Sequence, residues 1–257
     1  MAASEIPETT DDPRMTERYV RTVPGDDDGA GGDVVLIGVV HDHPASVYRV
    51  RRIVESVDPD VLALELPPLA LPLFEAYADD RRTPPPLGGE MSAAIQAASR
   101  SGTPTQVAAV DGPSPVFAGR LLVELYRESA SRETAATTLR GLVRVTRHAV
   151  TCRLAAVASR GPVTLEVDGA HAYEVCHDDE PAVQAADEHR QISKATTALR
   201  AFGSTPATRL RDRTREAHMA EGIAARLRDG DVVAVVGLDH LESLEDRLTD
   251  RLADRST

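Results

Sequence analysis

Two apolar segments near opposite ends of the chain each contain a glycine that is followed, three positions later, by a histidine. The first is VVLIGVV at 34–40, with His41 after it, and the second is VVAVVG at 232–237, followed by His240. Short apolar runs rich in β-branched residues are typical of strands buried on both faces of a parallel sheet. Because ligands of such sheets bind outside the carboxyl ends of the strands, we expect both histidines at one edge of one sheet.

A strand–helix–strand unit begins with the first of these segments. Apolar residues recur at helical spacing over 46–57, DPD at 58–60 ends the helix, and VLALEL at 61–66 is a second apolar strand. A unit of this length predicts two parallel strands joined by a right-handed crossover. We place the second strand beside the first, so that Glu65 near its end lies close to the histidines.

Three further segments are predicted from local signals. RRTPPPLGGE at 81–90 is rich in proline and glycine and predicts a loop. QVAAVDG at 106–112 predicts a third strand that ends at Asp111. A threonine cap followed by proline begins a helix that we expect to run over about 205–228.

Together these elements predict an α/β fold, with a single domain over 33–257 whose mainly parallel or mixed sheet is flanked by helices. The middle of the chain, about 114–205, is predicted to be a variable, mostly helical insertion, because about 114–160 is rich in Ala, Leu and Arg with a helical pattern. A hairpin that turns at Asp168-Gly169 is expected within it at 162–175. Residues 1–32 are polar, acidic and rich in glycine, which predicts a disordered or loosely attached leader.

Two histidines and one or two carboxylates at a sheet edge form the ligand set of a divalent metal ion such as zinc, manganese or iron. His41, His240 and Glu65 are the candidate ligands, and Asp111 is a further candidate. A metal ion in such a site lowers the pKa of a bound water molecule and makes it a nucleophile. The alternative is structural: the histidines cap strands, Glu65 pairs with an arginine, and Asp111 is a turn residue.

Four segments of the chain, in this order, resemble motifs of the TraB/PrgY family. LIGVVH at 36–41 resembles the family's opening strand with its GTxH ending, and DPDVLALEL at 58–66 resembles its PDxVxVEL segment. TREAHMA at 214–220 stands in the place of its ERDxxMA helix motif, and VVAVVGLDHLES at 232–243 resembles its closing VVAVVGxGHxxG signature. The family is related to the TIKI and GumN proteins and, more distantly, to erythromycin-esterase-like and ChaN-like folds.

The resemblance implies a metal-dependent hydrolase of the peptidase type that acts on a peptide or another small signal molecule. It implies that His41 and His240 are metal ligands and that Glu65 is a ligand or a general base. By the same resemblance Arg215 binds a substrate carboxylate or stabilises an oxyanion, and Glu216 orients Arg215 or faces the site. The alternative within the family is a non-catalytic module that binds or sequesters peptide signals.

The chain also departs from the family pattern. Asp42-His43 stands where Val-Ser is usual, Leu69 and Ala70 stand where an arginine is frequent, and Ser243 replaces a glycine. These departures favour the binding module slightly over the hydrolase.

Two further histidines are candidates for the site. His43 lies two residues beyond His41, and His218 lies three residues after Arg215, on a similar face of the predicted helix. For each, a histidine exposed to solvent is the alternative.

Composition limits the expected partners. The chain has 29 Lys+Arg against 41 Asp+Glu, a net charge of −12, so we expect no nucleic-acid partner, which would require a basic face. We expect no membrane span, because no apolar run is long enough, and no disulfide framework. We expect a cytoplasmic protein that forms a homodimer. Lys194 is the only lysine; such an acidic, arginine-rich composition is typical of adaptation to high salt or of a GC-rich genome.

Overall fold

A sheet with strand order β1-β2-β5-β3-β4 forms the centre of the computed structural model, which describes residues 12–25, 31–158, 167 and 173–254. Its parallel strands are β2 (Val34–Val39), β5 (Val232–Gly237), β3 (Val61–Leu64) and β4 (Gln106–Ala109). At one edge, β1 (Val20–Val23) pairs with β2 in the antiparallel direction. The mixed, mainly parallel sheet is therefore as predicted.

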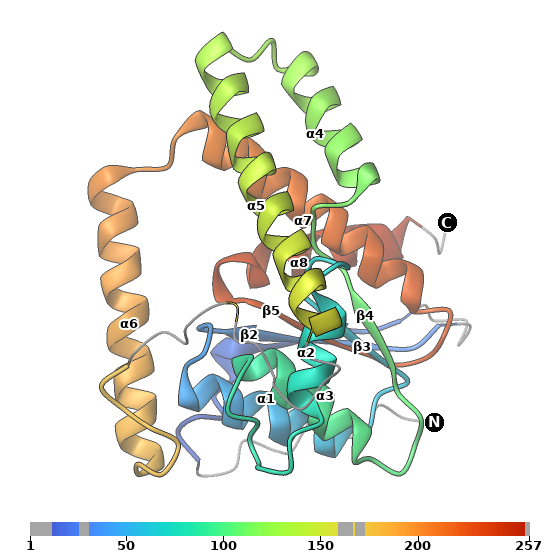
Figure 1. Ribbon diagram of the computed structural model, residues 1–257, viewed down its shortest axis with the longest axis vertical. Coiled ribbons are helices and arrows are strands. Elements are labelled where there is room, and N and C mark those ends of the chain that lie inside the picture. The colour runs from blue at the N-terminus through green and yellow to red at the C-terminus, as the bar shows by residue number, and fades with distance from the viewer. Residues whose placement is uncertain (1–11, 26–30, 159–166, 168–172, 255–257) are drawn as a thin grey trace.

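Helices cover both faces of this sheet (Figure 1). The helices α1 (Pro44–Val57), α2 (Leu71–Ala78) and α3 (Gly89–Ser99) lie on one face, and α7 (Pro206–Arg226) and α8 (Leu238–Ala253) lie on the other. Strand residues alternate between the two cores, because successive side chains of a strand point to opposite faces. Leu36 and Ala234 pack with α7 and α8, whereas Ile37 and Val235 pack with α1 and α3. This is the predicted α/β single domain.

The described part of the middle region is mostly helical, as predicted. It contains α4 (Pro115–Arg127) and α5 (Arg132–Ala158), which extend away from the sheet, and α6 (Pro181–Phe202), which runs along one side of the domain and contacts α1 (Figure 1). Most of the expected hairpin at 162–175 falls outside the described residues. Within the described ranges, no helix has both the length and the apolar character that a membrane crossing requires.

We expected β3 to lie directly beside β2. This prediction is wrong, because β5 lies between them. Residues 34–39 of β2 pair with 232–237 of β5, which pairs through its other edge with β3. Every side chain of β5 is buried, as a strand in the middle of a covered sheet requires. As a consequence, the histidine after β5 lies between the residues that follow β2 and β3.

The predicted leader is also corrected where the structure describes it. A short helix, η1 (Glu17–Tyr19), leads into β1, so the domain begins before residue 33. Met15, Tyr19 and Val23 are buried, and they are apolar positions in an otherwise polar segment. Their burial, together with the pairing to β2, offsets the conformational entropy that a polar segment loses on ordering.

Candidate functional site

The carboxyl edge of the parallel sheet brings together the main residues expected at the site. His41 follows β2, Glu65 follows β3 directly, and Asp111 follows β4. His240 lies in the first turn of α8, which begins where β5 ends, and Arg215 comes from α7. The side chains that the strand pattern placed at one edge therefore do meet.

Gly237, the last residue of β5, lies at the centre of this group. A methyl group on its Cα would lie 3.4 Å from Glu65 Oε2, 3.5 Å from His41 Nε2 and 3.8 Å from His240 Cδ2. The 3.5 Å and 3.8 Å distances place His41 Nε2 within about 7.3 Å of His240 Cδ2. Two imidazoles and one carboxylate thus surround a single small space that only a glycine leaves open.

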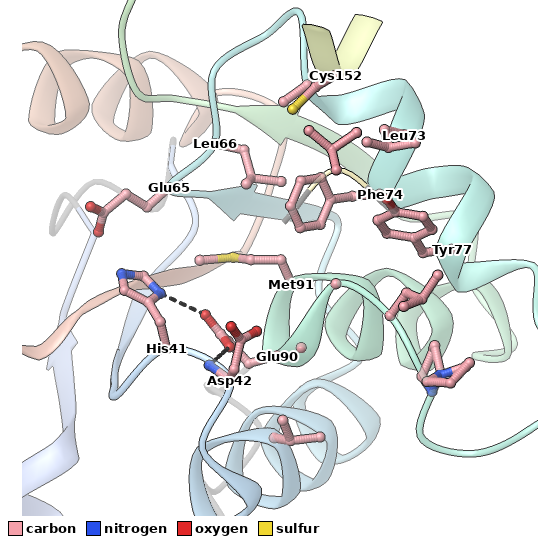
Figure 2. A pocket seen from close by; sticks show the side chains of 18 of the residues that line it. His41, Asp42, Glu65, Leu66, Leu73, Phe74, Tyr77, Glu90, Met91 and Cys152 are labelled. Atoms are coloured by element: carbon pink, nitrogen blue, oxygen red, sulfur yellow. Dashed lines mark hydrogen bonds and ion pairs between the residues drawn. The ribbon is translucent and has the colours of Figure 1, made fainter. Parts of the chain in front are cut away.

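Each of the two histidines is oriented by a carboxylate. His41 Nδ1 donates to Glu90 Oε1 at 2.8 Å (Figure 2), and His240 Nδ1 donates to Glu216 Oε1 at 3.1 Å. With Nδ1 engaged, Nε2 of His41 is left for the space around Gly237, whereas Nε2 of His240 lies beside Arg215. The hydrogen bond to Glu90 raises the pKa of His41. Burial alone would lower the pKa of His240, but Glu216 and Glu65 together raise it.

Arg215 is held by two carboxylates. Its Nε and Nη2 bond to Asp111 Oδ1 and Oδ2 at 3.0 and 2.7 Å, and Nη2 also bonds to Glu65 Oε1 at 2.7 Å. Its Nη1 lies 3.4 Å from His240 Nε2. Burial would lower the pKa of Arg215, but Asp111 and Glu65 raise it further, so the guanidinium stays charged. The predicted pairing of Glu65 with an arginine therefore exists, within the site itself.

Glu90 is a site residue that the sequence reasoning missed, because residues 81–90 were expected to form a loop. Helix α3 instead begins at Gly89, which buries Glu90 to 2% exposure in its first turn. Glu90 Oε2 also accepts from the backbone N–H of Asp42 at 2.8 Å, and Asp42 has the left-handed φ of 60°. The available signal was a single carboxylate at the start of a segment of small and apolar residues.

Two candidate histidines lie elsewhere. His43 is fully buried and caps α1: its Nδ1 accepts from the N–H of Ala45, and its Nε2 lies 3.2 Å from Asp187 Oδ2. His218 Nε2 lies 3.3 Å from Ser114 Oγ, at the start of α4. These contacts do not support His43 or His218 as an additional site residue. Neither histidine is exposed to solvent, which was the alternative.

The donor atoms fit a divalent metal ion by their chemistry. Two imidazoles and a carboxylate are ligands of zinc and related ions, and histidine ligands commonly give their other N–H to a carboxylate. In the present arrangement, however, no three His, Cys, Asp or Glu side chains of the described residues are gathered as a metal centre. The guanidinium of Arg215 lies against two of the candidate ligands, Glu65 and His240. A metal site is therefore a proposal that rests on the donor set.

Comparison of the chain with protein-family models, with curated proteins and with solved structures finds no significant match. The resemblance to the TraB/PrgY family, the cytoplasmic location and the homodimer stay predictions.

Proposed function

We propose that this chain is a metal-dependent hydrolase of the TraB type that cleaves a peptide or another small signal molecule. The observation that supports the proposal best is the arrangement around Gly237, where His41, Glu65 and His240 surround one point. Both histidines give Nδ1–H to a buried or half-buried carboxylate, which fixes the ring, and Nε2 of His41 faces the space around Gly237.

In this proposal, His41 and His240 hold a divalent ion, and Glu65 is either a third ligand or the general base. Such an ion would supply Lewis-acid activation of water and of a carbonyl group. As general base, Glu65 accepts a proton from the attacking water molecule at Oε2, the oxygen that faces Gly237. Arg215, held in place by Asp111, stabilises negative charge that develops on the substrate.

The substitution Gly237→Ala tests this arrangement without removing any ligand. Gly237 has φ −57° and ψ 140°, which alanine adopts readily, and the added methyl group meets its neighbours at ordinary contact distances. We expect the variant to fold like the wild type but to lose metal and activity, because the methyl group fills the space between the ligands. Gly119→Ala on α4 is the matched control, since a methyl group there meets open space.

The measurement is elemental analysis of protein prepared without chelators. The wild type and Gly119→Ala should contain a stoichiometric divalent metal. Gly237→Ala and the double variant His41→Ala, His240→Ala should contain little. A wild type without stoichiometric metal, or a double variant that retains it, would overturn the proposal.

A second candidate function is a module that binds peptide signals without cleaving them. The position of Arg215 favours it, because a cation bonded to Glu65 and 3.4 Å from His240 Nε2 opposes the binding of a second cation there. Incubation with a peptide library followed by mass spectrometry separates the two functions. Cleaved products support the hydrolase, whereas peptides retained intact support the module.

A further inference from the structure

Two hollows meet at the candidate site, and His41 and Glu65 belong to the walls of both. One is a cavity of about 490 Å³ whose walls include side chains of α2 and α3, the segment 85–88 between them, and Cys152 of α5. The other is a groove of about 580 Å³ lined by residues of α6 and α7 and by the start of α8, including Gln191, Arg211 and His240. A substrate bound over His41 and Glu65 can therefore extend into both.

The wall of the cavity formed by α2 and the start of α3 is largely apolar, while Asp42, His148 and His177 line other parts of it. Figure 2 shows Leu73, Phe74, Tyr77 and Met91 around it, with Glu65 and His41 at one end. Leu73, Tyr77 and Met91 are buried at their positions and Phe74 is half-buried, so these walls are packed into the domain. An apolar hollow of this size takes a bulky apolar group.

Glu90, one of three carboxylates that line the cavity with Asp42 and Glu65, lies next to this apolar wall. Both oxygens of Glu90 are already engaged, one by His41 Nδ1 and the other by the N–H of Asp42. A polar group that entered the cavity would lose its hydrogen bonds to water, whereas an apolar group gains by leaving water. Selection in this hollow therefore rests on apolar bulk.

The groove has both apolar and charged walls: Ile192 and Leu238 line it together with Arg211 and Asp212. Arg211 and Asp212 pair within it at 2.9 Å, and their side chains are 42% and 31% exposed. The partly exposed ion pair leaves this side of the groove hydrated, which suits the polar backbone of an extended peptide.

We propose that the substrate is a peptide with a bulky apolar side chain next to the bond that is cleaved. This side chain enters the cavity between α2 and α3, and the remainder of the peptide lies in the groove beside α6 and α7. The inference rests on the proposed function, since it places the cleaved bond over His41 and Glu65. Phe74 is the specificity-determining residue.

The test compares two probes, acetyl-Gly-Gly-Phe-Gly-Gly-amide and the same peptide with Ala in place of Phe. Calorimetric titration is done in buffer with EDTA, which removes divalent metal ions and so prevents metal-dependent cleavage while binding is measured. We expect the wild type to bind the Phe peptide at least about tenfold more tightly than the Ala peptide, because apolar bulk is what the cavity discriminates.

Two variants of one half-buried position keep the test independent of folding defects. Phe74→Trp adds bulk at the apolar wall and should reduce the preference for Phe to about twofold or less, whereas Phe74→Ala should weaken it partially. Tyr126→Ala is the control, because Tyr126 is an aromatic residue on α4 with 86% exposure, and it should leave the preference intact. Circular dichroism verifies that each variant is folded.

The outcomes separate this inference from the proposed function. Equal binding of both peptides by the wild type, or an unchanged preference in folded Phe74→Trp, overturns the inference. A preference for Phe without cleaved products in the presence of metal supports the cavity assignment and counts against the hydrolase. Cleavage irrespective of side-chain bulk supports the hydrolase and overturns the cavity assignment.

Discussion

The carboxylate of Glu65 accepts a hydrogen bond from the backbone N–H of Gly237 at 2.6 Å, which joins the end of β3 to the end of β5. The other oxygen of Glu65 binds Arg215 at 2.7 Å. One side chain therefore fixes the backbone at the centre of the site and also holds the cation beside it.

Replacement of Glu65 by alanine should cost more stability than replacement by glutamine. Glu65→Ala leaves the buried N–H of Gly237 without its acceptor, and we expect a loss of about 1–3 kcal/mol in the free energy of unfolding. Glu65→Gln keeps an acceptor oxygen, so it should lose less stability but should abolish hydrolysis, because the amide is no base. Urea denaturation and peptide cleavage measure the two effects. Glu55→Gln, on the outer face of α1, is the control, and a stable Glu65→Ala protein would contradict the argument.

Arg215 should be among the most sensitive positions in the chain. Arg215→Met leaves the buried carboxylates of Glu65 and Asp111 uncompensated, and loss of one partner from such a group costs about 3–5 kcal/mol. Arg215→Lys keeps the charge but not the bidentate contact with Asp111, so we expect an intermediate loss. Denaturation midpoints in urea check the ranking, which would be refuted if lysine and methionine behaved alike.

The buried pair of Arg49 and Glu188 should control how α6 is attached to the domain. Arg49 Nη2 donates to Glu188 Oε2 at 2.6 Å, both side chains are almost fully buried, and Ser46 donates to the same carboxylate. Each single substitution, Arg49→Met or Glu188→Leu, should cost about 3–5 kcal/mol, because it leaves one charge buried without its partner.

The double variant should cost less than the sum of the two single losses, since it removes both charges at once. Hydrogen exchange should show faster exchange in the first turns of α6 in the single variants. Additive losses, or unchanged exchange in α6, would mean that this pair does not hold the helix.

The strands next to the site could be predicted because burial on both faces leaves continuous apolar runs such as those at 34–39 and 232–237. Their order could not, because a strand from the end of the chain inserts between β2 and β3, and no local pattern encodes that choice. Glu90 was missed for a related reason. Its partners, His41 and Asp42, are about fifty positions away, so its role appears only when α3 packs against α1. The leader was misjudged because three buried side chains outweigh a polar composition.

His218 should make the attachment of α4 dependent on pH. The Oγ of Ser114 caps α4 by accepting from the N–H of Phe117 and lies 3.3 Å from Nε2 of His218, to which it can donate its hydroxyl proton. Only a neutral imidazole accepts that proton. Burial, with a smaller contribution from Arg120, holds the pKa of His218 below its ordinary value of 6.5, although the charges of Asp111 and Glu221 act in the opposite direction.

Because the pKa of His218 is lower in the folded chain than in the unfolded chain, the unfolded chain takes up the proton first as pH falls. The stabilisation that the neutral ring provides is therefore complete above about pH 6.5 and is lost as pH falls from 6.5 through the folded pKa. His218→Gln removes this titration, so its free energy of unfolding should decline less than that of the wild type between pH 7.5 and 5.5. Urea denaturation at both pH values measures the difference. His189→Gln, at an exposed position on α6, should follow the wild type, and equal slopes for all three proteins would show that His218 does not titrate with folding.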